Sequence, residues 1–326
     1  MVRMGMIGAG YIAEIMSNTV RQMNAAGDHC VELYGIASRS REKAQQFAED
    51  HGIRKAYGSY EDLAADPRID LAYVAVPHPF HVDAAKLCME HGKAVLMEKP
   101  FAVNAAETRE LIRLAKEKKL LITEAMWTRY QPIRKTIYDT VYSGIVGEPK
   151  MLQANLGSPN PRTRIHLPEL AGGALLDIGV YALNFAEMLF GRAGGVKAVC
   201  AKNQNGVDIS DTYTMTFSDG KIAVLYASVD VMLENIGMIY CTEGYIRVRN
   251  VNNPDAIEIY DRNRRLIRSI ESPARLTGYE FEVAETAAAL EAGRLECASM
   301  PHAETVHIME LADEIRRQMG IVYPFE

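Results

Sequence analysis

Short apolar segments alternate with amphipathic helical segments through the first 124 residues, and this alternation limits the folds that the chain can form. Nearly continuous apolar runs, which we expect to be strands, occur at 2–7, 31–37, 71–76 and 94–97. The segments between them have the spacing of helices. Strands that are apolar on both faces and separated by helices form parallel sheets covered on both sides. Residues 1–124 are therefore predicted to form an α/β domain with a doubly wound parallel sheet.

After residue 124 the pattern changes to helices and hairpins. Alternating segments flank turns such as Ser218-Asp219-Gly220, which is typical of antiparallel strand pairs. Helices are expected over 175–190, 280–291 and 302–319. Residues 125–326 are therefore predicted to form a second, α+β domain, and a chain of 326 residues also favours two domains over one.

Composition and charge disfavour several classes of protein. The net charge of −6 argues against a nucleic-acid-binding protein, which would present a basic face. The five cysteines are widely separated, so we expect neither a metal site nor disulfides, and reduced thiols favour a cytoplasmic location. A strand and a glycine loop at the N-terminus leave no room for a signal peptide, and we expect no apolar run to reach the length of a membrane span. We therefore expect a cytoplasmic protein that binds neither nucleic acid nor membranes.

A glycine-rich loop follows the first predicted strand. The run Gly8-Ala9-Gly10-Tyr11-Ile12-Ala13 matches the G-x-G-x-x-A pattern of dinucleotide-binding loops, with a strand before it and a helix after it. Gly8 allows a tight turn, and Gly10 lets the backbone approach a pyrophosphate at the helix N-terminus. The βαβ context favours this interpretation over an ordinary turn between a strand and a helix.

The end of the second predicted strand distinguishes NAD from NADP. NAD sites normally carry an acidic residue there for the ribose 2′-hydroxyl, whereas this chain has Ser38-Arg39. A hydroxyl and a guanidinium attract a 2′-phosphate, and Lys43 lies four residues after Arg39 on the same helical face. NADP(H) is therefore the predicted cofactor. The alternative is that Arg39 and Lys43 are surface charges.

Polar residues also end two further apolar strands. Glu98-Lys99-Pro100 follows the run 94–97, and ligands bind at this end of the strands in open α/β sheets. His78 and His81 follow the run 71–76 in the same way. Either histidine could contact the cofactor, although a packed or helix-start histidine is the more common case, so we rank both below Lys99.

The predicted helix 175–190 carries an acid and a phenol. Asp177 and Tyr181 are four residues apart and would share one helical face, after the glycine pair Gly172-Gly173. A buried aspartate is rare without a partner, and Lys99 is a candidate. In the alternative interpretation, Tyr181 is an ordinary core residue and Asp177 caps a neighbouring element.

Together, these motifs resemble the Gfo/Idh/MocA oxidoreductase family. The glycine loop, Glu98-Lys99-Pro100 and the run from Gly172 to Tyr181 carry the resemblance, and the ending from Gly320 to Glu326 extends it over nearly the whole chain. Many members have a histidine where this chain has Tyr181. With the tyrosine, the chain is similar to the branch that holds glucose–fructose oxidoreductase, NADP-dependent xylose dehydrogenase and dimeric dihydrodiol dehydrogenase.

Two further segments fit this branch and one position departs from it. Ser38-Arg39 and the segment from Glu124 to Tyr130 are similar to the branch, whereas Ala171 stands where it often has a third glycine. We expect that change to affect local backbone freedom and not chemistry.

The resemblance implies a Rossmann domain followed by a domain with an open, mostly antiparallel sheet, which commonly forms a subunit interface. It implies an active site between the domains, with the nicotinamide over Lys99, and a homodimer or higher homo-oligomer. Tyr181 would be the acid/base, because the Lys99 ammonium favours its phenolate. Lys99 could also hydrogen-bond the substrate oxygen, and Asp177 would orient Lys99 or the substrate. Trp127 and Arg129 would contact the substrate.

The expected function is NADP(H)-dependent hydride transfer between the nicotinamide and a hydroxyl carbon of a sugar, polyol or cyclic diol, or the matching carbonyl. The expected cofactor contacts are Gly8, Gly10, Tyr11, Ile12, Ser38, Arg39, Lys43, Pro77, His81, Glu98 and Lys99. The alternatives are an NAD-dependent inositol-type dehydrogenase and a non-enzymatic NADP-sensing regulatory protein on the same scaffold. The sequence names neither the substrate nor the direction of transfer, and it leaves the roles of Arg162 and Arg164 open.

Overall fold

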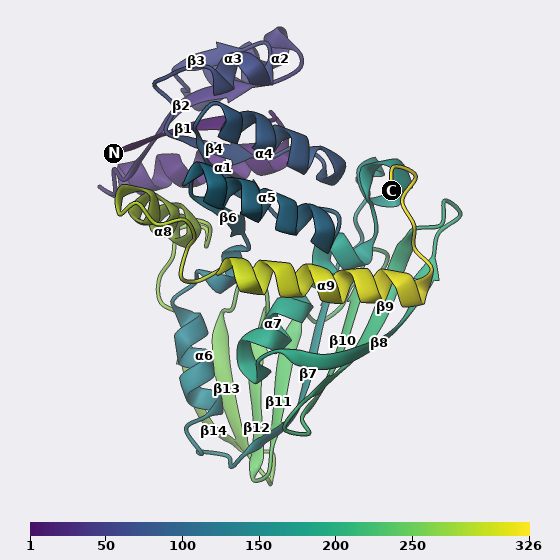
Figure 1. Cartoon of the computed structure of the whole chain (residues 1–326). Coiled ribbons are helices and arrows are strands. Elements are labelled where there is room, and N and C mark those ends of the chain that lie inside the picture. The colour runs from purple at the N-terminus through teal and green to yellow at the C-terminus, as the bar shows by residue number, and fades with distance from the viewer. The chain divides into compact units, whose positions relative to one another are not determined.

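The computed structural model describes all 326 residues, and they form two compact units. The first unit contains Met1–Tyr130 and Arg275–Val306, and the second contains Gln131–Ala274 and His307–Glu326. Figure 1 shows the chain coloured from its N-terminus to its C-terminus. The predicted division after residue 124 lies near the first junction, and the return of Arg275–Val306 to the first unit was not anticipated from the sequence.

The first unit contains a six-stranded parallel sheet. Its strands are β1 (Val2–Ile7), β2 (Val31–Ala37), β3 (Lys55–Tyr57), β4 (Leu71–Val74), β5 (Ala94–Glu98) and β6 (Ile122–Ala125). Their order is β3-β2-β1-β4-β5-β6, and every pair is parallel. This is the strand order of a doubly wound Rossmann sheet, so the predicted fold class is confirmed for this part.

Helices follow the strands of the first unit, as the alternating pattern predicts. They are α1 (Tyr11–Ala25), α2 (Arg41–His51), α3 (Tyr60–Ala64), α4 (His81–Glu90), α5 (Ala105–Lys118) and α8 (Glu280–Glu291), with 3₁₀ turns η1 (His78–Phe80) and η2 (Trp127–Arg129). The side chains of Ser40, Ser59 and Asn104 accept hydrogen bonds from the first turns of α2, α3 and α5. Such caps fix where a helix begins.

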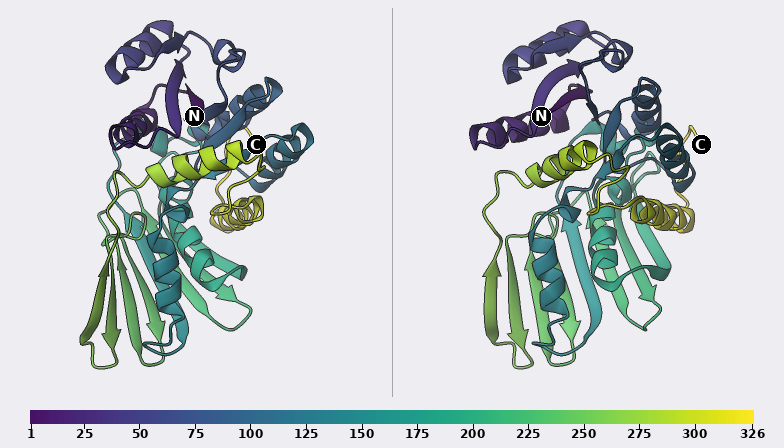
Figure 2. Two further views of the ribbon diagram at one scale, coloured as in Figure 1. Left: turned by 90° about the vertical axis from the view of Figure 1, so that its left-hand side faces the viewer. Right: turned by 60° about the vertical axis from the view of Figure 1, so that its left-hand side comes forward.

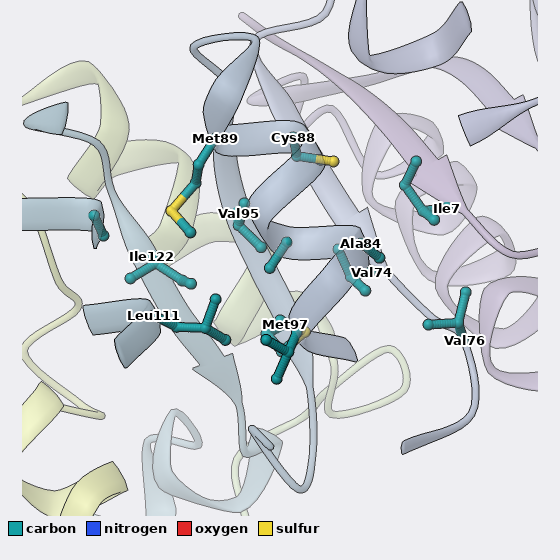
Figure 3. Close-up of a cluster of buried hydrophobic side chains, with 14 of the residues drawn as sticks. Ile7, Val74, Val76, Ala84, Cys88, Met89, Val95, Met97, Leu111 and Ile122 are labelled. Carbon is teal, nitrogen blue, oxygen red and sulfur yellow. The ribbon is translucent and has the colours of Figure 1, made fainter. Parts of the chain in front are cut away.

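A cluster of buried apolar side chains holds α4 and α5 against the sheet (Figure 3). The strands contribute Val74, Val95 and Met97, while the helices contribute Cys88 and Leu111. All five are fully buried. Cys88 is therefore a packing residue, and burial raises the pKa of its thiol to about 12. The carboxyl ends of β4 and β5 are thereby held on a rigid base.

The second unit contains an eight-stranded sheet. Its strands are β7 (Pro149–Gly157), β8 (Ala193–Lys202), β9 (Asp208–Phe217), β10 (Ile222–Ser228), β11 (Ile236–Cys241), β12 (Gly244–Arg249), β13 (Ala256–Asp261) and β14 (Leu266–Glu271). Their order is β14-β13-β12-β11-β7-β10-β9-β8, and only β7 and β10 pair in parallel. The predicted mostly antiparallel sheet is confirmed, and its hairpins are those expected. Strand β8 was not predicted.

The helices of the second unit include one irregular segment. They are α6 (Ile133–Val141), α7 (Val180–Phe190) and the part of α9 (His302–Met319) from residue 307 on, with 3₁₀ turns at Thr163–His166 and Pro168–Leu170. Helix α7 packs on β7 and β10, and Figure 2 shows the sheet from two further directions. The helix predicted over 175–190 begins as a π-turn, Leu175–Gly179, in place of a regular α-helix. Single π-turns within helices are frequent at functional sites.

One segment is long and apolar enough to cross a membrane, contrary to the expectation from the sequence. Pro168–Phe190 has a window of mean hydropathy 1.3, of which 89% is buried inside the protein. Core helices of globular proteins meet the same criteria when their apolar face is covered by a sheet, as α7 is covered here.

Candidate functional site

Parallel strands bring their carboxyl ends to one edge of a sheet, so the motifs of the first unit lie along the same edge. Gly8 follows β1, Ser38 follows β2, Lys99 follows β5, and Trp127 lies two residues after the end of β6. This edge is where open α/β sheets bind ligands. The sequence predicted these positions one motif at a time, and the sheet order makes them neighbours.

The two glycines of the loop meet different surroundings. Gly8 has a φ of +104°, and a Cβ there would lie 2.6 Å from the Ala75 carbonyl oxygen, so only glycine fits. Gly10 has extended backbone, and no atom lies within 4 Å of where its Cβ would be. It begins α1 without a side-chain cap, so the helix dipole and the open space together suit an anionic group. Ala13 is fully buried, as close packing of α1 on the sheet requires.

A pocket of about 230 Å³ lies beside the end of β2. Three charged residues line it, Arg39, Glu61 and Asp83, together with apolar side chains, among them Tyr60, Val76, Pro77, Phe80 and Leu87. The apolar part of this wall suits a flat base, and the Arg39 guanidinium suits a phosphate attached to it. Tyr60 and Phe80 were not anticipated as site residues, because nothing in their local spacing distinguishes them from core residues.

Ser38 and Lys43 take different places from Arg39. Ser38 is buried, and its hydroxyl accepts a hydrogen bond from the Ser40 N–H at 3.4 Å. Ser40 in turn caps α2 by accepting from the Lys43 N–H at 3.2 Å. The Lys43 side chain is exposed and does not line the pocket. Of the predicted cationic pair, Arg39 alone is part of the pocket wall.

The backbone of Lys99 is fixed by the residue before it. The buried Glu98 carboxylate accepts hydrogen bonds from the Tyr73 hydroxyl and from the Lys99 N–H, the latter at 3.2 Å. Burial raises the pKa of Tyr73 well above that of a free phenol, so Tyr73 is the donor to Glu98. Glu98 therefore anchors the strand end that carries Lys99. The Lys99–Pro100 bond is cis.

His81 ties two strand ends together. Its Nδ1 lies 2.9 Å from the Pro100 carbonyl oxygen, and its Nε2 lies 2.9 Å from the Val76 carbonyl oxygen. The ring is almost fully buried, and His78 packs edge-on against it at 5.7 Å between ring centroids. The imidazole thus fixes the backbone beyond β4 relative to the backbone beyond β5. Its contact with a cofactor stays a prediction.

Trp127 forms an aromatic wall at the end of β6. Its indole stacks on Tyr279 with 4.2 Å between ring centroids and 16° between planes. Its Nε1–H is buried and has no hydrogen-bond acceptor in the protein, which makes it a candidate donor to a ligand. Tyr279 lies in the segment that returns to the first unit and was not predicted. The guanidinium of Arg129 is buried and ion-paired with Glu304 at 3.2 Å, so its substrate contact stays a prediction.

Two buried carboxyl groups near these strand ends were also not predicted. Burial raises the pKa of Glu124 to about 7, although its carboxylate accepts from the Phe101 N–H at 3.1 Å. Burial and the nearby Glu98 raise the pKa of Glu282 well above its usual range. Neither oxygen of Glu282 has a hydrogen-bond partner. Burial and the neighbouring Glu98 carboxylate therefore both favour the protonated form of Glu282.

Asp177 lies on the π-turn of the second unit, and Tyr181 lies in the first turn of α7. The Asp177 carboxylate is buried and accepts from the Arg164 guanidinium at 2.8 Å. Arg164, whose role the sequence left open, is thus a partner of Asp177 within its own unit. The π-turn changes the helical spacing, so the simple four-residue repeat that placed both side chains on one face does not describe this segment.

The glycine run before the π-turn is tightly enclosed. The Tyr323 hydroxyl donates to the Gly172 carbonyl at 3.0 Å, and a side chain at Gly173 would collide with the Asp208 carboxylate. Ala171 has a φ of +48°, the left-handed conformation that glycine adopts most readily. The effect on the local backbone that was expected at Ala171 is therefore a strained, left-handed conformation at this one residue.

The chain matches two family models. Residues 2–126 match the Gfo/Idh/MocA model, described as an oxidoreductase family with an NAD-binding Rossmann fold. Residues 135–247 match the Gfo/Idh/MocA C-terminal domain. The two matches fall on the two sheets described above.

Curated relatives match over almost the whole chain. Trans-1,2-dihydrobenzene-1,2-diol dehydrogenase of Xenopus tropicalis is 34% identical over 328 residues, covering 98% of this chain and 98% of that protein. The Homo sapiens protein of the same name is 30% identical over 335 residues, covering 99% and 98%.

Solved structures share the fold. KijD10, a 3-ketoreductase from Actinomadura kijaniata in complex with NADP and TDP-benzene, superimposes with a TM-score of 0.87 at 24% identity, covering 98% of each chain. UDP-N-acetylglucosamine 3-dehydrogenase GnnA from Acidithiobacillus ferrooxidans gives a TM-score of 0.79 at 23% identity, covering 97% of each chain.

Proposed function

The chain belongs to the Gfo/Idh/MocA oxidoreductase family, and from that membership we propose that it is an NADP(H)-dependent enzyme. It transfers a hydride between the nicotinamide and the hydroxyl-bearing carbon of a cyclic diol, sugar or polyol, or the matching carbonyl. The observation that carries this proposal is the single sheet edge that holds the uncapped start of α1, the Arg39 pocket and Lys99.

The residues of the first unit fit an NADP molecule. The start of α1 at Gly10 would hold the pyrophosphate, since the backbone there is open and the helix dipole favours anions. The pocket lined by Arg39 would hold the adenine end, with the guanidinium on the 2′-phosphate. The end of β2 carries no acidic side chain at Ser38-Arg39, so the acidic residues of the pocket wall are Glu61 and Asp83 from other elements. Lys43 would add charge only from outside the pocket.

The remaining chemistry is proton transfer. When bound, NADP(H) supplies the hydride donor or acceptor. In the direction of alcohol oxidation, Tyr181 takes the hydroxyl proton as general base, and in the reverse direction it returns that proton to the carbonyl oxygen. The Lys99 ammonium stabilises negative charge on the substrate oxygen. Asp177 orients the substrate hydroxyl, and its ion pair with Arg164 limits the positions that its carboxylate can take.

The substrate class rests on the relatives. The curated relatives are named for oxidation of a trans-dihydrodiol, and they are 30% to 34% identical over nearly the full chain. We therefore propose a cyclic diol as the first substrate class and sugars as the second. The aromatic surface of Trp127 and Tyr279 suits the face of a ring in either class.

Initial rates of NADP⁺ reduction test the proposal, with NAD⁺ in parallel and a panel of trans-dihydrodiols, aldoses and inositols. Turnover of one class with preference for NADP⁺ is expected. Tyr181→Phe should remove most turnover while NADP affinity is kept, and Tyr138→Phe, an exposed tyrosine on α6, is the matched control. Near-wild-type rates for Tyr181→Phe would contradict its acid/base role. Preference for NAD⁺ with inositol would favour the inositol-type alternative, and tight NADP binding without turnover would favour the sensor.

The open face of the second sheet supports a homodimer. Met238 and four tyrosines lie on the face opposite Phe185 of α7, namely Tyr226, Tyr240, Tyr245 and Tyr260. Tyr245 stacks on Tyr260 with 4.7 Å between ring centroids. Tyrosine and methionine are enriched in protein interfaces. Light scattering after gel filtration should give a dimer that Tyr245→Glu dissociates, and a wild-type monomer would contradict this part of the proposal.

A further inference from the structure

Two buried aspartates on β9 lie against the glycine run and the π-turn. Asp208 accepts a hydrogen bond from the Leu175 N–H at 2.7 Å and another from the Ala174 N–H. Asp208 thus caps the start of the π-turn, and its carboxylate occupies the space beside Gly173. Asp211 is the second aspartate, and both side chains are nearly inaccessible to solvent, with exposed fractions of 1% and 3%. Neither residue was singled out in the sequence or assigned a role above.

The hydrogen-bond partners of the pair identify where a proton must be. Asp208 and Asp211 are buried neighbours whose carboxyl groups influence each other's pKa, and two ionised carboxylates have no donor with which to form a hydrogen bond. Asp208 already accepts from backbone N–H groups. Asp211 accepts from the Tyr213 hydroxyl at 2.6 Å through Oδ2, whereas its buried Oδ1 has no donor. A proton on Oδ1 of Asp211, donated to Asp208, satisfies both side chains.

We propose that Asp211 remains protonated at neutral pH and donates to Asp208, and that this acid pair positions the π-turn that carries Asp177 and leads into Tyr181. Both aspartates are positioning residues, since they act through the backbone of Gly173 to Leu175. The consequence for turnover rests on the proposed function, whereas the protonation state does not.

The surroundings of the pair supply little to stabilise a second negative charge. The ionisable groups that face it are Cys200 on β8, Tyr213 on β9 and Tyr323 near the C-terminus. All three are neutral near pH 7 because burial raises the pKa of each. Strand β10 places Ala227 opposite Asp211. Lys202 of β8 has its ammonium on the Gly320 carbonyl oxygen at 2.8 Å.

Burial and the adjacent Asp208 raise the pKa of Asp211 to about 9, in agreement with the geometry. The pKa of Asp211 is therefore higher in the folded protein than in the unfolded chain. The protonated carboxyl stabilises the fold fully at pH values below the unfolded pKa, and this stabilisation is lost as pH rises through the folded pKa. Above that range two like charges lie side by side, and the cap on the π-turn weakens.

Infrared spectroscopy tests the protonation state directly. Wild-type protein at pH 7 should show the carbonyl stretch of a protonated carboxyl group. Asp211→Asn should lack this band, because asparagine has no carboxyl group, while its amide N–H can still donate to Asp208. Glu124→Gln and Glu282→Gln, which remove carboxyls outside the pair that also have raised pKa values, are the matched controls for assigning the band. Identical wild-type and Asp211→Asn spectra would overturn the proposal.

Unfolding and kinetics test the positioning role. Relative to Asp211→Asn, the wild-type unfolding equilibrium constant should rise about tenfold for each unit of pH between the unfolded and folded pKa values. Asp208→Asn should lower kcat at least tenfold without changing NADP affinity, and Asp211→Asn should keep its kcat at alkaline pH where the wild type loses activity. Full kcat in Asp208→Asn, or the same alkaline loss in Asp211→Asn, would refute positioning. If no substrate is turned over, the spectra and unfolding still decide the protonation state, so the two proposals fail separately.

Discussion

Alanine should act differently at the two glycines of the loop. Gly8→Ala should lower the stability of the protein, whereas Gly10→Ala should weaken NADP binding. At Gly8, a φ of +104° costs a non-glycine residue about 1–3 kcal/mol. The new methyl group would also lie 2.6 Å from the Ala75 carbonyl oxygen, and that backbone has to move at a cost of about 1–3 kcal/mol. Gly8→Ala should therefore lower the unfolding free energy by roughly 3 kcal/mol or more, even without cofactor.

At Gly10 the same methyl group meets nothing within 4 Å, and its φ of −112° is open to any residue. The poorer helix cap costs at most about 1 kcal/mol. The methyl group would instead occupy the space where a pyrophosphate approaches the start of α1. Loss of even one hydrogen bond to a charged phosphate costs about 1.5–3 kcal/mol, so Gly10→Ala should weaken NADP binding at least about tenfold.

Circular dichroism melts of the cofactor-free proteins measure the first effect, and calorimetric titration with NADP measures the second. For a unit of this size, roughly 3 kcal/mol corresponds to a fall of about 6–12 °C in Tm. Gly8→Ala should show that fall, and Gly10→Ala should melt near the wild type while binding NADP poorly. Equal Tm losses in both variants, or wild-type NADP affinity in Gly10→Ala, would refute the assignment of one glycine to the turn and the other to the ligand.

Three further outcomes are expected. Arg39→Ala should weaken NADP binding by about tenfold to a hundredfold in calorimetric titrations, because a charge-assisted contact with the 2′-phosphate is lost. NAD binding should be unchanged, and an equal loss of affinity for both cofactors would contradict the role of Arg39. Burial raises the pKa of Glu124 from 4.5 to about 7. In urea titrations, the unfolding free energy of the wild type relative to Glu124→Gln should therefore fall by about 3 kcal/mol as pH rises from 4.5 to about 7. A difference between the two proteins that does not change with pH would contradict this. His307 lies 3.3 Å from the Glu187 carboxylate, which raises its pKa, so His307→Gln should destabilise the protein at acidic pH and less as pH rises through that pKa; an effect that grows with pH would reverse the sign.

The sequence was sufficient for the fold class because the signals were periodic and local. Strands β1 and β4 are apolar on both faces, and Ser218-Asp219-Gly220 marks a hairpin that the β9–β10 pairing confirms. Strand β8 gave no such signal, because only Val196 of Ala193–Lys202 is buried and two glycines follow Ala193. The family membership predicted from the motifs is confirmed by the family models and the curated relatives.

The candidate site could be predicted only where a motif lies within one stretch of sequence. Tyr279 is more than 150 residues from Trp127, and only the return of the chain to the first unit brings their rings together. Asp208 and Arg164 reach the π-turn from other elements in the same way. The π-turn itself differs from a helix by hydrogen bonds that no residue pattern announces. The roles of Lys99, Asp177 and Tyr181 stay predictions.

Trp127 is the one tryptophan of the chain, and its indole is stacked on Tyr279 inside the first unit. Its fluorescence is therefore an intrinsic reporter of that unit alone, while far-ultraviolet circular dichroism senses both units. Coincident transitions by the two signals would mean that the units unfold together, and separated transitions would mean that each melts independently. In the proposed NADP(H) complex the same ring would pass excitation to the reduced nicotinamide, so one natural fluorophore would read out both cofactor occupancy and the integrity of its unit.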